Sequence, residues 1–149
     1  MKYLFEENQK FTQWWLWIIL LYFPTSALFI HNDPINYIYV LIGCAIPLVF
    51  YLFELRVKVD QNGLHYQFFP LHFKSYTIIL DEMEKIEAVE YKPISEYGGW
   101  GIKYGFKGKA YNTSGKLGVK IHLKNGTNIL FGSQKHKALA KVLKQIKQQ

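Results

Sequence analysis

Residues 11–30 read FTQWWLWIILLYFPTSALFI, and residues 35–53 read INYIYVLIGCAIPLVFYLF. Neither run contains Asp, Glu, Lys or Arg, and only the four residues HNDP separate them. A helix rises about 1.5 Å per residue, so about 20 residues cross a hydrocarbon core that is about 30 Å thick. The two runs therefore predict a hairpin of transmembrane helices, preceded by a cytoplasmic tail at residues 1–10 and followed by one domain at residues 54–149.

Charges around the two runs predict the orientation of the hairpin. Lys2 and Lys10 precede the first run, Arg56 and Lys58 follow the second, and the connection has neither Lys nor Arg. Because Lys and Arg concentrate on the cytoplasmic side, we expect a multi-pass protein of the bacterial inner membrane with both termini in the cytoplasm. A cleaved signal peptide is the alternative for the first run, but this run is long and no small-x-small cleavage site follows it. Four aromatic residues are predicted to anchor the helices at the membrane interface: Trp14, Trp15, Trp17 and Tyr51.

The rest of the chain has the alternation that is typical of strands. Residues 55–59 and 64–68 alternate apolar and polar side chains on either side of Asn62-Gly63, which is a strong hairpin signal. Asn125-Gly126 marks a second hairpin. Further strands are predicted at about residues 73–80, 86–91, 100–107, 119–124 and 127–131. Period-2 alternation indicates that one face of each strand is buried.

The chain is predicted to end in an amphipathic helix. Ser133 is a plausible N-cap, and one apolar stripe follows it, made of Leu139, Val142, Leu143 and Ile146. About seven antiparallel strands followed by one helix is the order of a pleckstrin-homology-like (PH-like) fold. The predicted fold class is therefore α+β, with a two-helix transmembrane hairpin and a PH-like β barrel or sandwich capped by a C-terminal helix. This is an analogy of fold, which does not establish a function.

One segment also resembles a family. The run YKPISEYGGWGIK at residues 91–103 resembles a segment of small, uncharacterised bacterial membrane proteins that carry a two-helix hairpin and a PH-like domain. The similarity continues through residues 108–112, 115–118, 124–126 and 132–134. The resemblance implies a bacterial membrane location and a PH-like fold. It implies no activity, substrate or catalytic residue.

The predicted domain is basic. Residues 54–149 hold 16 of the 18 basic and 8 of the 11 acidic residues, a net charge of +8 before histidine is counted. Anionic lipid and nucleic acid are the usual partners of such a surface, and the tether favours lipid over nucleic acid. A basic face that is merely solvated is the structural alternative. The candidate anion-binding residues lie on the outward phase of two strands and their connection: Lys103, Lys107, Lys109, Lys116 and Lys120.

The segment Gly98-Gly99-Trp100-Gly101 is the most distinctive motif of the domain. Glycines that bind phosphate lead from a strand into a helix, whereas these lead into a strand. We therefore predict a structural role, as a bulge or tight bend with Trp100 packed into the core.

No motif indicates catalysis, a metal or a cofactor. The five histidines lack metal-ligand spacing, and the acidic run from Asp81 to Glu90 lacks the spacing of an EF-hand. The leading hypothesis is a membrane-anchored, non-enzymatic interaction module that binds a protein partner, a second copy of itself or the anionic lipid surface. An extended partner could add to an exposed strand edge. The alternative is an accessory subunit of a transport or envelope-stress assembly that acts through its helical hairpin.

Overall fold

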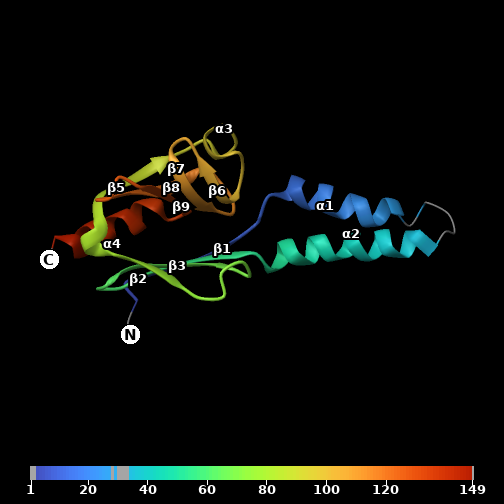
Figure 1. Cartoon of the computed structure of the whole chain (residues 1–149), viewed down its shortest axis with the longest axis horizontal. Helices are drawn as coiled ribbons and strands as arrows, with labels where there is room; N and C mark the ends of the chain where they lie inside the picture. The colour runs from blue at the N-terminus through green and yellow to red at the C-terminus, as the bar shows by residue number, and fades with distance from the viewer. Residues whose placement is uncertain (1–2, 28, 30–33, 149) are drawn as a thin grey trace. The chain divides into compact units, whose positions relative to one another are not determined.

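The computed structural model describes residues 3–27, 29 and 34–148, with side chains at 27 and 34–36 excepted, as two compact units (Figure 1). The β unit comprises residues 1–10 and 54–149, and the helical unit comprises residues 11–53. Lys10 and Glu54 are paired across neighbouring strands. The helical unit is therefore an insertion between two adjacent strands of the β unit, and residues 1–10 belong to the same domain as the C-terminal two thirds of the chain.

The first sheet of the β unit has four antiparallel strands in the order β1-β2-β3-β4. Their bounds are β1 (Phe5–Lys10), β2 (Glu54–Val59), β3 (Gly63–Phe69) and β4 (Tyr76–Ile79). A short 3-10 helix, η1 (Leu80–Glu82), then leads from β4 into the second sheet.

The second sheet has five strands in the order β5-β8-β9-β7-β6. Their bounds are β5 (Met83–Glu90), β6 (Gly101–Gly105), β7 (Gly108–Asn112), β8 (Leu117–Leu123) and β9 (Asn128–Gly132). The pair β7 and β9 is parallel, and the other pairs are antiparallel. A short helix, α3 (Pro93–Tyr97), precedes β6, and α4 (His136–Lys147) follows β9.

Both predicted Asn-Gly hairpins are confirmed. Asn62-Gly63 joins β2 to β3 in the register that pairs Val59 with Leu64. Asp60 accepts hydrogen bonds from the N–H groups of Asn62 and Gly63, at 2.8 and 3.2 Å. Asn125-Gly126 joins β8 to β9, and Gly126 has a φ of 84°, a conformation that glycine adopts without strain. Local turn chemistry therefore sets the register of both pairs.

The predicted terminal helix is present as α4, which packs along β5 and β8 (Figure 1). Leu139 and Leu143 are fully buried, and Val142 and Ile146 are half-buried. The predicted apolar stripe is therefore confirmed. The predicted N-cap is wrong, because α4 begins at His136 and its N-cap is Lys135.

A buried polar contact holds β1 in place. The carboxylate of Glu7 accepts hydrogen bonds from the hydroxyl of Ser133, at 2.5 Å, and from the N–H of Gln134, at 3.0 Å. The side-chain amide of Gln9 donates to the carbonyl of Gly132 at 2.6 Å. The side chains of Glu7 and Gln9, both on β1, are buried. The first strand is thus bonded to the segment between β9 and α4, at the other end of the chain.

The helical unit contains α1 (Trp14–Ala27) and α2 (Pro34–Leu52), which lie side by side (Figure 1). A Cβ atom on Gly43 would lie 3.1 Å from the Cα of Pro24, so the glycine allows the helices to approach closely there. The ring of Phe11 lies 5.5 Å from that of Phe50 and 6.0 Å from that of Phe53. These contacts hold the two helices together within the unit.

The prediction of a transmembrane hairpin is contradicted. Within residues 3–27, 29 and 34–148, no helix combines the length and the apolar character that crossing a membrane requires. The first apolar run has 20 residues, whereas α1 has 14, a rise of about 21 Å, and residues 11–13 of the run precede the helix. Side chains of α2 are described only from Tyr37 onward. The predicted location as a multi-pass inner-membrane protein with cytoplasmic termini depended on these spans and is contradicted with them.

Two further predictions depend on the hairpin. The four aromatic residues predicted to anchor the helices lie on α1 and α2, with Trp14 and Tyr51 the most exposed: Trp14, Trp15, Trp17 and Tyr51. The indole N–H of Trp17 donates to the carbonyl of Phe11 at 3.1 Å. Of the predicted connection HNDP at residues 31–34, which the orientation places opposite the cytoplasmic termini, residues 31–33 lie outside the described residues and Pro34 begins α2.

The prediction of a seven-stranded PH-like domain is also contradicted, because the β unit has nine described strands in two sheets. The two additional strands are β1 and β7. Inward positions of β1 include Glu7 and Gln9, so hydrophobic alternation is absent from its sequence. β7 begins at Gly108 and carries Lys109 and Asn112, and it is a strand because β6 and β9 pair with it on either side.

Candidate functional site

The five lysines predicted to bind anions lie on three strands and in two connections. Lys103 is on β6, Lys107 in the β6–β7 turn, Lys109 on β7, Lys116 just before β8 and Lys120 on β8. The strand registers place Lys103 and Lys120 on one face of the second sheet and Lys109 on the other. The structure therefore does not gather the five side chains into one patch.

Two of these lysines are paired with carboxylates. Lys107 lies 3.1 Å from Glu96, and Lys116 lies 2.5 Å from Glu90. The hydrogen bond from Lys116 lowers the pKa of Glu90. Burial would raise the pKa of Glu96, but its contact with Lys107 and other favourable interactions outweigh that effect and lower the pKa. Both acids are therefore carboxylates at neutral pH, and each neutralises one positive charge.

Lys109 has a different environment, in a cluster of aromatic rings. Its ammonium lies 5.0 Å from the ring centre of Tyr104 and 4.8 Å from that of Tyr111, within the range of cation–π attraction. Tyr111 in turn lies 4.8 Å from Tyr66 of the first sheet. Among the described residues, no carboxylate lies within ion-pair distance of Lys109. Its positive charge thus lies against two aromatic rings of the second sheet.

The same cluster extends to the start of β4. His72 lies 5.8 Å from Tyr111 and 4.8 Å from Tyr76, and Tyr76 also stacks on Tyr66 at 5.7 Å. Burial and then the charge of Lys109 lower the pKa of His72, so its ring is neutral near pH 7. Tyr76 is nevertheless 51% exposed. A half-exposed tyrosine that two rings hold in place is the kind of side chain that anchors protein interfaces.

The glycine- and tryptophan-containing motif lies between α3 and β6. Gly98 ends α3 with a φ of 74°, and Gly99 and Gly101 have φ values of 121° and 116°. Trp100 is half-buried, and its indole N–H donates to the carbonyl of Gly115 at 2.9 Å. The segment is thus a turn whose backbone conformation favours glycine, with its tryptophan bonded to the connection before β8.

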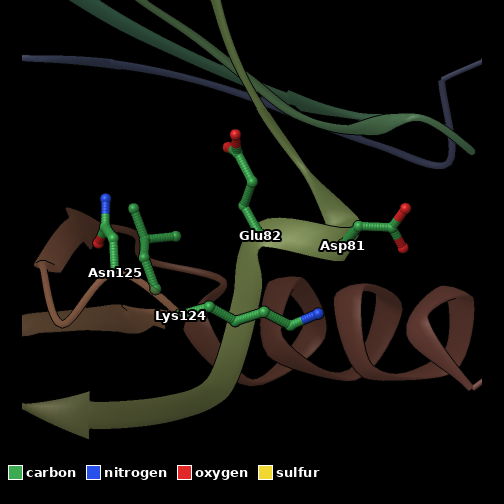
Figure 2. A pocket seen from close by; sticks show the side chains of 5 residues that line it. Asp81, Glu82, Lys124 and Asn125 are labelled. Carbon is green, nitrogen blue, oxygen red and sulfur yellow. The ribbon is translucent and has the colours of Figure 1, made fainter.

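A pocket of about 280 Å³ lies at the junction of η1 with the β8–β9 turn. Its lining residues are Asp81, Glu82, Leu123, Lys124 and Asn125. Figure 2 shows that the carboxylates of Asp81 and Glu82 point away from each other, so they do not form one ligand set. Throughout the described residues, no group of three or more His, Cys, Asp or Glu side chains could hold a metal ion. The pocket leaves two acidic side chains accessible directly after β4.

β4 differs from the other three strands at sheet edges. β1 carries Glu6 and Lys10 on its outward face, β5 has four charged residues and a register shift after Met83, and β6 carries Lys103. α3 also packs so closely on β6 that a Cβ on Gly105 would lie 2.4 Å from the carbonyl oxygen of Glu96. β4 reads YTII, without charge, proline or bulge. Charges, proline and bulges are usual protections of an edge, and the four residues of β4 contain none of these three.

The backbone of β4 presents hydrogen-bonding groups at this edge. The N–H of Leu80 donates to the carbonyl of Asn62, and the register continues by pairing Ile79 with Gly63. Hydrogen-bonded and non-hydrogen-bonded pairs alternate along antiparallel strands. Tyr76 and Ile78 therefore direct their N–H and C=O groups to β3, while Thr77 and Ile79 direct theirs outward. Among the described strands, β3 alone pairs with β4.

The alternation of side chains predicts a strand at residues 73–80 but does not indicate that this strand forms a site. The uncharged run at residues 76–79 was a signal of an aggregation-prone strand, yet the pattern does not distinguish an edge from a central position. The order of strands in the sheet makes that distinction. Ile79, which is 46% exposed, and Tyr76 are the apolar side chains at the open edge.

Comparison with known proteins adds no assignment to this site. No protein-family model matches the chain, and no curated protein matches it either. The resemblance to small bacterial proteins with a PH-like domain stays a prediction.

Proposed function

We propose that the chain is a non-enzymatic interaction module whose β unit receives an extended segment of a protein partner along the open edge of β4. The observation that carries this proposal is the combination of an unprotected edge with outward backbone groups at Thr77 and Ile79. Strand addition satisfies such groups through main-chain hydrogen bonds, and side chains supply the selectivity. Tyr76 provides a fixed aromatic anchor at the start of the edge.

The polar groups of the β unit support binding better than catalysis. The buried carboxylates of Glu7 and Asp60 are occupied by hydrogen bonds within the fold. The side chain of Asn112 accepts from the N–H of Gly101 and donates to the hydroxyl of Tyr91. These side chains hold strands and turns together, and the proposal assigns them no chemical step.

The proposal predicts that short linear peptides bind the full chain through β4. We expect peptides selected from a displayed library to lose on the order of a hundredfold in affinity when Ile79 is replaced by proline. Ile79 has a φ of −73°, which proline adopts, and its N–H points outward, so Ile79→Pro removes an edge donor while preserving the bonds to β3.

The matched control is Ile79→Val, which keeps the N–H and a branched side chain and should retain binding. Hydrogen exchange should also show that a bound peptide protects the amides of Thr77 and Ile79. Selected peptides that bind the proline and valine variants equally well would count against β4 as the site.

A second candidate function is binding of an anionic lipid surface. The β unit contains all 18 basic residues of the chain and 10 of the 11 acidic ones, since residues 11–53 contribute only Asp33. Phe73 and Phe106 are 83% and 109% exposed, and each precedes a lysine. Aromatic side chains beside lysines favour the boundary between water and lipid head groups.

This candidate predicts charge-dependent binding to vesicles. Each basic residue near an anionic surface contributes about 1 kcal/mol, so Lys103→Gln with Lys120→Gln, two lysines on the same face of the second sheet, should weaken binding about tenfold or more at low salt. The matched control neutralises the two lysines that are already paired with carboxylates, Lys107 and Lys116, and should have a smaller effect. Sedimentation with anionic and with neutral vesicles measures the charge-dependent part as a difference. Equal binding to both vesicle types would exclude this function.

A further inference from the structure

We propose that the extended segment on β4 comes from a second copy of this chain, so that two β units pair antiparallel through their β4 strands about a twofold axis. This inference rests on the proposed function, since it requires that the edge of β4 accept a strand. It adds the identity of the partner, the register of the pairing and the residues that make it specific.

Backbone geometry selects one register. Two identical antiparallel strands in one sheet are related by a twofold axis perpendicular to the sheet, so one residue lies opposite itself. With Ile78 at the axis, Thr77 of each copy lies opposite Ile79 of the other. Thr77 and Ile79 are the residues that direct their backbone groups outward. This register therefore bonds every outward N–H and C=O group of both β4 strands.

Side chains are compatible with this register on both faces of the joined sheet. Tyr76 of each copy lies opposite Leu80 of the other on the inner face, and both side chains are apolar. Thr77 lies opposite Ile79 on the outer face, and β-branched residues pair well across strands. Tyr76 and Ile79 are about half exposed in the single chain, so pairing removes apolar surface from water.

Charges at the two ends of β4 are complementary in an antiparallel pair. Lys74 precedes the strand, and Asp81 and Glu82 follow it. In the register centred on Ile78, the end of β4 that follows Lys74 meets the end of the other β4 that η1 follows with Asp81 and Glu82, and this juxtaposition occurs twice. Among the described residues, none of these three side chains has an ion-pair partner within its own chain. Figure 2 shows the carboxylates of Asp81 and Glu82 extending in different directions from η1, and both residues are exposed.

The uncharged strand between these ends explains why two basic units can meet there. Two copies of a unit with a net charge of +8 repel each other over distances comparable to the Debye length. β4 contributes no charge to the contact, and the acidic residues after it attract the lysine before it. Opposite charges at the ends also favour antiparallel over parallel pairing, because parallel strands would place like charges side by side.

The first test measures self-association of the full chain by analytical ultracentrifugation, in mild detergent because α1 and α2 expose apolar side chains. We expect a monomer–dimer equilibrium that Ile79→Pro weakens on the order of a hundredfold and that Ile79→Val leaves unchanged. Thr77→Lys, which adds a charge at the edge without altering the backbone, should weaken it as well. A dimer that survives both substitutions forms elsewhere, and that result would overturn the inference.

The second test measures the register by disulfide trapping. Cys44 is the chain's own exposed thiol, so Cys44→Ser is the background. Copies with Thr77→Cys and copies with Ile79→Cys are mixed and oxidised. We expect cross-linking between the two kinds of chain to exceed cross-linking within either kind, because residue 77 lies opposite residue 79. Equal yields in all three combinations would contradict the register.

The third test exchanges charges. Lys74→Glu should weaken the dimer about tenfold, Glu82→Lys should do the same, and the double variant should restore it. Lys92→Glu, an exposed charge reversal outside the contact, is the control. Failure of the double variant to recover association would refute the end-to-end charge contact.

The outcomes separate this inference from the proposed function. If the displayed peptides bind β4 but the full chain is a monomer at all accessible concentrations, the edge accepts a different protein and the self-pairing is wrong. If the peptides do not bind and the chain is also a monomer, both are wrong.

Discussion

Leu143→Ala lowers the free energy of unfolding of the β unit by about 2–5 kcal/mol, the usual cost of truncating a fully buried leucine. Leu143 has no exposed surface and lies on the face of α4 that packs along β5 and β8. The substitution removes apolar burial and leaves a cavity between the helix and the sheet. Native-state hydrogen exchange of the β8 amides in the full chain measures the effect, because these amides report opening of the β unit.

The matched control for Leu143→Ala is Lys144→Ala, an exposed substitution on the same helix that should change stability by less than about 0.5 kcal/mol. Equal exchange protection in the two variants would mean that α4 does not contribute to the core.

Glu7→Ala should destabilise the β unit by about 2–4 kcal/mol, because hydrogen bonds to a charged acceptor are strong and their loss leaves the buried hydroxyl of Ser133 without its acceptor. The donors are the hydroxyl of Ser133 and the N–H of Gln134. Urea unfolding of the full chain, with exchange protection in β1 and β2 as the local readout, measures the loss. β1 should lose protection more than β8 does, since Glu7 bonds this strand to the end of β9.

Two further variants test the reason for this effect. Glu6→Gln changes the neighbouring residue, whose pair with Lys58 at 2.7 Å is partly exposed, and should cost less than about 1 kcal/mol. Ser133→Ala combined with Glu7→Ala should cost less than the sum of the single changes, because each removes the same hydrogen bond. Additive effects would show that the carboxylate and the hydroxyl act independently.

Local patterns predicted the elements whose determinants are close in the sequence. Asn-Gly turns at residues 62–63 and 125–126 and the stripe of α4 were predicted from residues within one or two turns of chain, and the structure contains them. The same reasoning failed for β1, whose inward Glu7 and Gln9 look like surface residues. Their hydrogen-bond partners lie more than 120 residues away, and no local pattern indicates them.

Apolar composition was also insufficient to define the helices. Two long uncharged runs predicted two membrane spans, but the length of a helix depends on the residue at which the helical conformation begins. Phe11 is buried and its ring contacts Phe50 and Phe53, and α1 begins only at Trp14, so the start of the first apolar run is not helical.

The candidate site likewise depends on contacts between distant segments as well as on local sequence patterns. The five lysines were identified by strand phase, but the register of the second sheet separates them over two faces and pairs Lys107 and Lys116 with acids. β4 lies within a predicted strand, but the sequence pattern of that strand does not indicate a position at the edge of a sheet. Strand order, which is a property of the whole sheet, decided which strand is open.

By itself, the sequence determined the two Asn-Gly hairpins, the amphipathic terminal helix, the basic character of the β unit and the uncharged nature of β4. These properties depend on single residues or on neighbours within a few positions, where turn geometry, side-chain periodicity and charge act directly. Tertiary structure alone decided that β1 joins the sheet across an inserted helical unit, that Glu7 is bonded at the far end of the chain and that β4 is left open. Those outcomes depend on contacts between segments distant in sequence, and they arise only when the whole sheet assembles around its core.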